Sequence, residues 1–326
     1  MKAMLCKAFG EPESLVLEEI ASRPLAGNEI RVRVHVAGVN FPDILITQGK
    51  YQYKPEFPFS PGGEAAGEVI EVGAEVSRFR PGQRVVAMAP YGAYAEEMVA
   101  PESRVMAIPD ELDFTTAASI SLTYGTSAYA LIDRAHLQPG ETLLVHGAAG
   151  GVGLSAVEIG KAMGARVIAT AGSDEKLRIV GEHGADELIN YSEGDFKDKV
   201  KELTGGKGAD VIYDPVGGDV FDQSLRCINW GGRLLVIGFA SGRIPSAPAN
   251  LALLKSCSIV GVFWGAWTER EPEASVANFE RILDWWRKGE IHPHISHTFP
   301  LAQAADALYA LIERKVVGKA VLRVVD

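Results

Sequence analysis

The sequence is poor in cysteine and in positive charge. Its 326 residues include three cysteines, Cys6, Cys227 and Cys257, whose wide spacing suggests neither a disulfide framework nor a metal or redox pair. Its 42 acidic side chains outnumber 32 basic ones, which gives a formal net charge of -10. We therefore expect no nucleic-acid partner and no anionic membrane surface, because both require clustered positive charge.

Long apolar runs are absent as well. No stretch approaches the ~18 consecutive apolar residues of a membrane span, and the first residues lack the apolar region of a signal peptide. The composition, with 47% hydrophobic and 23% charged residues, is typical of a well-packed globular protein. We expect a reduced, cytoplasmic protein whose length favours two domains.

The chain changes character near residue 113. The first third carries alternating apolar and polar residues, as in 30–36, and a turn at 81–84, which is typical of a mostly-β domain. A helical stretch over 115–133 follows, and strands then alternate with helices. This alternation predicts right-handed βαβ units and a parallel sheet covered on both faces. The predicted strands cover 142–146, 166–170, 210–214 and 232–237, and the predicted helices cover 153–163, 174–182 and 272–288.

A glycine-rich loop joins the first of these strands to its helix. In the sequence His146-Gly-Ala-Ala-Gly-Gly-Val-Gly153, small residues permit a tight turn and a close approach of the backbone to a pyrophosphate. Gly153 lets the helix pack against the strand, and the helix N-terminus attracts the phosphate charge. Ala148 stands where the strict fingerprint has its first glycine. We predict a dinucleotide site formed by Ala149, Gly150, Gly151 and Val152.

The end of the second strand indicates which dinucleotide binds. An NAD enzyme usually carries an acid there for the ribose 2′-hydroxyl, but this strand ends in Ala171 and Gly172. Ser173 and Lys176 offer a hydroxyl and a cation to a 2′-phosphate, which favours NADPH. Asp174 and Glu175 lie close by and are explained by the acid preference of a first helical turn.

These features together resemble a known family. The glycine loop, the segments 37–43 (AGVNFPD) and 61–67 (PGGEAAG), and the pair Asn190-Tyr191 are similar to those of zinc-independent, zeta-crystallin-like quinone oxidoreductases, a branch of the medium-chain dehydrogenase/reductases. The resemblance implies an α/β fold in which a Rossmann domain, with its doubly wound parallel sheet, is inserted in a GroES-like mostly-β domain. We expect the GroES-like catalytic domain over 1–122, the Rossmann NADPH-binding domain over 123–263, and a return to the catalytic domain over 264–326.

The resemblance also implies roles for individual residues, with the active site in the cleft between the domains. Asn40 and Asp43 would border the nicotinamide and the substrate, and Tyr51 would line the same cleft; these three are the expected catalytic residues. The expected cofactor contacts beyond the glycine loop, Ser173 and Lys176 are Asn40, Thr126, Tyr191, Gly238, Phe239, Val262, Phe263, Trp264 and Lys319.

The departures from zinc-dependent relatives bear on mechanism. Those relatives place a cysteine in the loop written here as 37–40 and a histidine just before Glu64, and this chain has neither. It also lacks their four-cysteine lobe. We therefore expect no metal site, and hydride transfer that relies on positioning of the cofactor and on polar groups such as Asn40 or Tyr51. The three histidines over 292–297 are interpreted as part of a surface strand.

The leading hypothesis is an NADPH-dependent reductase that passes hydride to a quinone or a similar conjugated carbonyl. An enoyl-CoA or enone reductase is the alternative, and an NADPH-binding protein with a structural or regulatory role is a third. The expected partners are a small-molecule acceptor and a second copy of the chain in a homodimer, the latter by analogy with the family.

Overall fold

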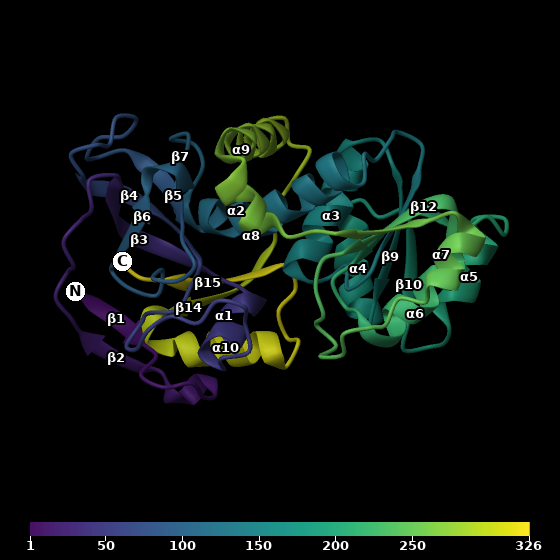
Figure 1. Cartoon of the computed structure of the whole chain (residues 1–326), viewed down its shortest axis with the longest axis horizontal. Coiled ribbons are helices and arrows are strands. Elements are labelled where there is room, and N and C mark those ends of the chain that lie inside the picture. Colours follow the sequence, from purple (N-terminus) through teal and green to yellow (C-terminus); the bar gives the residue numbers. More distant parts are fainter. Residues whose placement is uncertain (326) are drawn as a thin grey trace. The chain divides into compact units, whose positions relative to one another are not determined.

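The computed structural model describes residues 1–325, which form two compact units (Figure 1). The first unit contains Met1–Leu122 and the chain from Pro293 onward, and the second contains Thr123–His292. The boundary at 122/123 falls inside helix α2, Phe114–Ala128. Residues 264–292, which the sequence assigns to the returning segment, are part of the second unit because their helices pack there.

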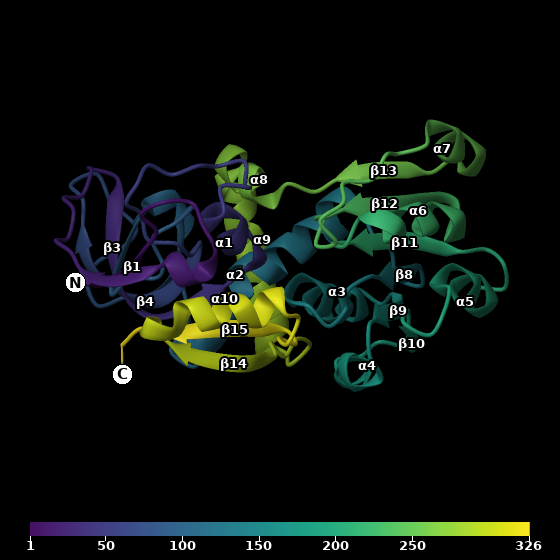
Figure 2. The ribbon, with the colours of Figure 1, turned by 90° about the horizontal axis from the view of Figure 1, so that it is seen from below.

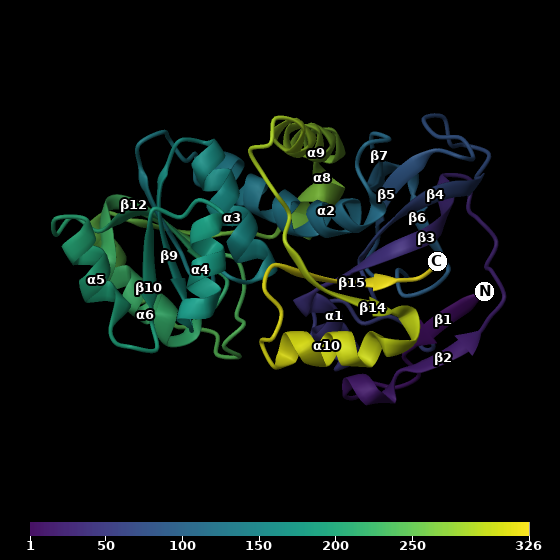
Figure 3. The same ribbon diagram turned by 180° about the vertical axis from the view of Figure 1, so that it is seen from behind.

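The first unit is built on a seven-stranded sheet. Its order is β14-β15-β3-β4-β5-β7, with β6 paired to β3, and its neighbours are antiparallel except for the parallel pair β14–β15. Figure 3 shows helix α10 alongside β14 and β15. The strands are β3 (Glu29–Val39), β4 (Glu64–Val72), β5 (Arg84–Met88), β6 (Glu97–Pro101), β7 (Val105–Ala107), β14 (Ile295–Pro300) and β15 (Lys319–Arg323).

Shorter elements complete the first unit. A two-stranded antiparallel ribbon forms at its N-terminus, and short helices connect the strands. These elements are β1 (Lys2–Leu5), β2 (Val16–Glu19), α1 (Phe41–Thr47), α10 (Ala304–Ile312) and the 3₁₀ turns η1 (Pro12–Ser14), η2 (Glu102–Arg104) and η4 (Leu301–Gln303).

Strand β3 departs from the simple alternation that the sequence predicts. Val32 and Val34 enter the core as expected, but Arg31, on the opposite face, is only 6% exposed. Its guanidinium binds Glu71 at 2.8 Å and Glu97 at 3.1 Å. Ion pairing therefore allows a charged side chain to be covered where the pattern predicts exposure.

The second unit contains the parallel sheet. Its order is β10-β9-β8-β11-β12-β13, so the chain moves outward from β8 in both directions, as in the doubly wound 3-2-1-4-5-6 arrangement. β10 and β13 form the two edges, and Figure 2 shows β13 at the rim beside helix α7. The strands are β8 (Thr142–Val145), β9 (Arg166–Ala171), β10 (Glu187–Asn190), β11 (Ala209–Asp214), β12 (Ile228–Val236) and β13 (Ser258–Gly261).

Helices connect these strands in sequence. A π-helical segment, η3 (Tyr129–Arg134), continues α2, and Tyr129 stacks on Trp267 of α8 with ring centroids 4.4 Å apart. This contact is one reason why α8 belongs to the second unit. The helices are α3 (Gly151–Ala162), α4 (Asp174–Glu182), α5 (Phe196–Leu203), α6 (Gly218–Cys227), α7 (Ala249–Lys255), α8 (Trp264–Arg270) and α9 (Pro272–Arg287).

The predicted fold class is confirmed: a Rossmann-type parallel sheet is inserted between the two parts of a GroES-like β unit. The helix predicted over 115–133 is α2 followed by the π-helical segment. Within residues 1–325, none of the helices has the length and apolar character needed to cross a bilayer.

Candidate functional site

The glycine loop forms the first strand-to-helix turn of the parallel sheet. β8 ends at Val145 and α3 begins at Gly151. Gly147 adopts a φ of 54°, a conformation that favours glycine. A Cβ on Gly153 would lie 2.2 Å from the Gly147 carbonyl oxygen, so the first turn of α3 lies directly against the loop. The residues present therefore fit a pyrophosphate at the N-terminus of α3.

A buried histidine anchors the start of this loop. His146 is 1% exposed, and its two ring nitrogens lie 2.9 Å from the hydroxyls of Thr170 in β9 and Ser224 in α6. Burial lowers the pKa of His146 to about 3, so the ring is neutral at physiological pH. A neutral ring can donate through one nitrogen and accept through the other, which satisfies both hydroxyl contacts.

The residues at the C-terminal end of β9, where we expect the ribose, are small or polar. Ser173 is the N-cap of α4, and its Oγ accepts a hydrogen bond from the Lys176 amide at 3.4 Å. The Tyr191 hydroxyl lies over Gly172, where a Cβ would approach it to 2.9 Å. The structure thus places Ser173, the Lys176 backbone and the Tyr191 hydroxyl at one end of the sheet, and the role of Ser173 and Lys176 at a 2′-phosphate stays a prediction.

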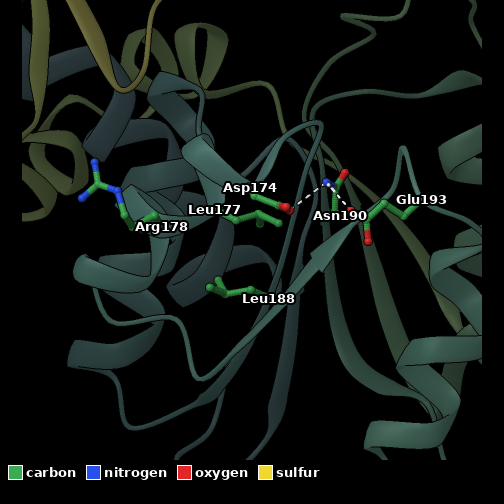
Figure 4. A pocket seen from close by; sticks show the side chains of 6 residues that line it. All are labelled: Asp174, Leu177, Arg178, Leu188, Asn190 and Glu193. Atoms are coloured by element: carbon green, nitrogen blue, oxygen red, sulfur yellow. Dashed lines mark hydrogen bonds between the residues drawn. The ribbon is translucent and has the colours of Figure 1, made fainter.

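Asp174 binds the neighbouring strand at this end of the sheet, where Asn190 of β10 lies beside Ala171 of β9. Its carboxylate accepts a 2.8 Å hydrogen bond from Asn190, which also contacts Glu193 at 3.4 Å (Figure 4). The side chains border a depression of about 370 Å³ that Leu177, Arg178 and Leu188 complete. Two carboxylates in this lining make the depression unsuitable for a phosphate, and the Asp174 carboxylate is occupied by its hydrogen bond from Asn190.

The remaining predicted cofactor residues of the second unit lie on α2 and at strand ends. Gly238 and Phe239 follow β12, and the segment 262–264 follows β13, where the Val262 amide binds the Val236 carbonyl at 3.1 Å. The Trp264 indole packs on Gly125, one residue before Thr126. Thr126 and Trp264 are therefore brought to neighbouring positions.

In the first unit, a cluster of buried polar side chains surrounds the start of α1. Asn40 and Asp43 are 4% and 2% exposed. The Asp43 carboxylate accepts hydrogen bonds from the backbone N–H of Asn40 at 2.8 Å and from the Tyr94 hydroxyl at 2.9 Å. It thereby caps the first turn of α1 and fixes the direction in which the chain leaves β3.

Burial dominates the acid–base behaviour of Asp43. It raises the pKa of the carboxyl to about 7, although the bonds from Asn40 and Tyr94 and the charge of Lys319 act in the opposite direction. Burial and the neighbouring Asp43 charge also raise the pKa of Tyr94 well above its ordinary range. Tyr94 is therefore a hydrogen-bond donor to Asp43 at any physiological pH.

Glu64 and Lys319 complete the cluster. Glu64 is fully buried at the start of β4, and Lys319 is 4% exposed at the start of β15. The Lys319 Nζ lies 2.6 Å from Glu64 Oε1 and 2.7 Å from Asn40 Oδ1. Burial alone would raise the pKa of Glu64, but the Lys319 charge and the hydrogen bonds outweigh it and lower the pKa.

Tyr51 lies outside this hydrogen-bonded cluster. It is half-buried in the segment that follows α1 and packs against the apolar group of Cys6, Ile46 and Phe59. Burial raises the pKa of its phenol, and the charge of Asp43 adds to this. Tyr51 is near enough to Asp43 to respond to its charge, and it is protonated at neutral pH.

The residues that replace the zinc ligands of other dehydrogenases do not fit a metal. An ammonium group, Lys319 Nζ, already binds the oxygens that Asn40 and Glu64 could offer to a cation. Over residues 1–325, no three His, Cys, Asp or Glu side chains are grouped so that they could hold a metal ion. The donor set of this cluster therefore does not suit a zinc ion.

The Ser121 hydroxyl also belongs to the cluster, because it donates a 2.7 Å hydrogen bond to Glu64 Oε2. The sequence does not identify Glu64, Tyr94 or Ser121 as parts of the site, nor Thr170 and Ser224 around the loop. Their partners are 24 to 255 residues away in the chain, and only the folded sheet brings them together. An acidic residue within the apolar start of a strand, as Glu64 is in 61–67, was the one available signal.

Comparison with known proteins gives consistent matches over the whole chain. Residues 26–110 match the alcohol dehydrogenase GroES-like domain, and residues 151–281 match the zinc-binding dehydrogenase family. A quinone oxidoreductase-like protein 2 homolog of Nematostella vectensis is 44% identical over 98% of this chain and 88% of its own length. A quinone oxidoreductase of Pseudomonas aeruginosa is 39% identical over 97% of both chains. The structure of Escherichia coli quinone oxidoreductase complexed with NADPH superimposes with a TM-score of 0.93 and 31% identity, covering 99% of this chain and 100% of the other.

Proposed function

Because this chain belongs to the zinc-independent quinone oxidoreductase branch of the medium-chain dehydrogenase/reductases, we propose that it reduces quinones and related conjugated carbonyls with NADPH. The observation that supports the proposal is the cluster of Asn40, Glu64 and Lys319, in which the buried carboxylate is already neutralised by an ammonium group. A reductase without a Lewis acid suits acceptors that are already electrophilic.

The residues that would hold NADPH are those of the glycine loop and the end of β9. The turn around Gly150 receives the pyrophosphate, and Ser173, Lys176 and Tyr191 surround the 2′-phosphate. Thr126 and the segments 238–239 and 262–264 flank the nicotinamide. NADPH supplies the hydride when it is bound.

The first unit supplies the polar groups for the acceptor. Asn40 has one Nδ2–H that is not used by Glu64, and Tyr51 has a phenol that stays protonated at neutral pH. Each can donate a hydrogen bond to an oxygen on which negative charge develops. Asp43 holds the backbone of Asn40 and is a positioning residue in this scheme.

The activity is tested by NADPH oxidation at 340 nm with 1,4-benzoquinone, 9,10-phenanthrenequinone, an enone and crotonyl-CoA, with NADH in parallel. We expect quinone turnover that is faster with NADPH than with NADH. Faster turnover of crotonyl-CoA than of any quinone would instead establish the enoyl reductase. Tight NADPH binding without turnover of any acceptor would favour a structural or regulatory role.

The 2′-phosphate site has a matched pair of test variants on α4. Lys176→Met and Arg178→Met each remove one positive charge, but the Arg178 side chain points away from Asn190 and Glu193 (Figure 4) and pairs with Glu182. A lost charge-assisted bond of about 1.5–3 kcal/mol corresponds to roughly a tenfold to hundredfold rise in KM. We expect this rise for NADPH in Lys176→Met alone, and equal effects of both variants would contradict the assignment.

We also propose that the chain forms a homodimer through edge strand β13. This strand pairs with β12 on one side, and helix α7 beside it has no buried residue. Large apolar side chains are exposed in this region, including Leu253 at 79%, Leu254 at 66% and Phe263 at 57%. Such a surface suits a two-fold contact in which the same strand of each copy continues the sheet.

The mass in solution tests the dimer. Light scattering should give twice the 34.9 kDa of one chain. Leu253→Asp should reduce the mass to that of one chain, because it places a charge in the apolar contact. Leu188→Asp, on the opposite edge strand β10 and 41% exposed, is the control and should leave the dimer intact. A single-chain mass for the unmodified protein would refute the proposal.

A further inference from the structure

The hydrogen-bonding capacity of Lys319 is used up within the first unit. Its ammonium group has three N–H donors, and three acceptors surround it: Glu64 Oε1 at 2.6 Å, Asn40 Oδ1 at 2.7 Å and the Val39 carbonyl at 3.3 Å. The residue is 4% exposed. No donor is left for a phosphate or a ribose, although the family resemblance implies that Lys319 contacts the cofactor.

Both carboxylate oxygens of Glu64 also accept hydrogen bonds from within the first unit. Its Oε1 accepts from Lys319 and from Asn40 Nδ2 at 2.8 Å, and its Oε2 accepts from the Ser121 hydroxyl at 2.7 Å and the Leu122 amide at 2.9 Å. The last two donors belong to α2, so the carboxylate is tied to that helix. A buried carboxylate and a buried ammonium each require the other, because either charge alone would be costly to desolvate.

Close packing fixes the position of the Glu64 side chain. A Cβ on Gly38 would lie 2.3 Å from Glu64 Oε1 and 2.4 Å from the Ala118 carbonyl oxygen. Only glycine at this place in β3 lets the carboxylate cross the strand to reach Asn40 and Lys319. The ion pair is therefore a fixed part of the fold and has no room to rearrange.

This pair determines the orientation of the Asn40 amide. The oxygen of the amide faces the Lys319 ammonium, and its nitrogen faces the Glu64 carboxylate. A flipped amide would place N–H groups against the ammonium and the oxygen against the carboxylate, and both contacts would be repulsive. The side chain is thus locked with one Nδ2–H left over, which is the only amide donor it can offer to another group.

We propose that Lys319 is a positioning residue that, with Glu64, fixes the Asn40 amide for the reaction, and that it is not a ligand of NADPH. The inference rests on the proposed reductase function. It predicts that loss of the Lys319–Glu64 pair impairs turnover while the affinity for NADPH is retained.

The test uses the full chain and three variants. Lys319→Met leaves Glu64 buried without its cation and is expected to be unstable, so Glu64→Gln/Lys319→Met, which removes both charges, is the main variant. Lys315→Met is the charge-matched control, because Lys315 is an exposed lysine that pairs with Glu313. NADPH dissociation constants are measured by fluorescence titration, kcat is measured with a quinone, and melting temperatures are measured without cofactor.

We expect the double variant to melt at a higher temperature than Lys319→Met, since it carries no unpaired buried charge. Its NADPH dissociation constant should stay within about threefold of the original, whereas loss of a direct ammonium–phosphate bond would raise it at least about tenfold. Its kcat should fall by up to about 10²-fold, because the Asn40 amide is released.

Two outcomes would overturn the inference. A tenfold or larger loss of NADPH affinity in the double variant, absent in Lys315→Met, would make Lys319 a cofactor ligand. An unchanged kcat would show that the orientation of Asn40 does not matter. Both are distinct from failure of the proposed function, in which the unmodified protein would itself bind no NADPH or reduce no quinone.

Discussion

The indole of Trp264 fills the space that a side chain on Gly125 would need. A Cβ at Gly125 would lie 2.7 Å from Trp264 Cζ2 and 2.9 Å from Cε2, closer than such atoms pack. This contact joins α2 to the segment that follows β13, and Thr126 is the next residue of α2. The absence of a side chain at one position therefore sets the distance between two predicted nicotinamide-flanking segments.

Gly125→Ala should force Trp264 out of place. Overpacking of this kind costs about 1–3 kcal/mol, so we expect a lower melting temperature and a higher dissociation constant for NADPH. Scanning fluorimetry and fluorescence titration measure the two effects. Gly265→Ala is the control, because its Cβ would meet only Phe263 Cε2 at 3.9 Å. If both variants behave alike, the Trp264 contact is not what positions the segment.

Two glycines of the phosphate loop should respond differently to alanine. Gly153→Ala would bring Cβ within 2.2 Å of the Gly147 oxygen, so both stability and NADPH binding should be lost. At Gly150, φ is -81° and a Cβ would be 3.4 Å from the same oxygen, so the fold should tolerate the change. Gly150→Ala should keep its melting temperature and weaken NADPH binding, because the backbone can no longer approach the pyrophosphate closely. Undiminished NADPH affinity in Gly150→Ala would place the pyrophosphate elsewhere.

His146 should make the protein sensitive to acid. Its pKa is about 3 in the folded state against an ordinary value of 6.5, so the unfolded chain binds more protons between these values. The contribution of neutral His146 to the free energy of unfolding is fully present above about pH 6.5, and it declines as the pH falls toward 3. His146→Leu leaves the Thr170 and Ser224 hydroxyls without their partner and should cost about 1–3 kcal/mol at neutral pH. The difference from the unmodified protein in urea denaturation should shrink at about pH 5; a constant difference would contradict the neutral buried ring.

Asp43 should make the free energy of unfolding depend on pH in the opposite direction to His146. Its pKa is raised from 3.8 to about 7, so the folded state binds more protons than the unfolded state between these values. Ionisation of this carboxyl therefore destabilises the fold progressively as the pH rises from about 4 to about 7. Asp43→Asn removes that dependence, so its stability relative to the unmodified protein should rise over the same range and then level off. Parallel pH profiles of the two proteins in urea denaturation would show that Asp43 has no raised pKa.

The local features of the cofactor site could be predicted from sequence. The phosphate loop lies within eight residues between a strand and a helix, so its spacing alone indicates the turn. The small residues at the end of β9 are similarly local: Ser173 caps α4, and the Tyr191 hydroxyl lies against Gly172. The alternation of strands and helices predicts the parallel sheet and its right-handed crossovers, but it does not predict that β11 returns to pair with β8.

The buried cluster of the first unit could not be predicted in the same way. Asn40, Glu64 and Lys319 are distant in the chain, and no periodic pattern links them. Lys319 illustrates the difficulty, since a basic residue in a cofactor-binding family is naturally interpreted as a phosphate ligand, whereas in the structure its donors are directed to Glu64, Asn40 and Val39. The burial of Lys319 and its choice of hydrogen-bond partners depend on the packing of three strands and a helix. This packing cannot be predicted from the composition.

The division of the chain has a consequence for its synthesis on the ribosome. Thr123–His292 is one continuous stretch, so all of its strands are available before the last residues have been translated. The first unit must wait, because β15 inserts between β14 and β3, and Lys319 is made 255 residues after Glu64. Until then, the Glu64 carboxylate has no cation to accompany it into the interior. The second unit can therefore fold while the sheet of the first unit is still incomplete, because that sheet closes only when β15 has been made.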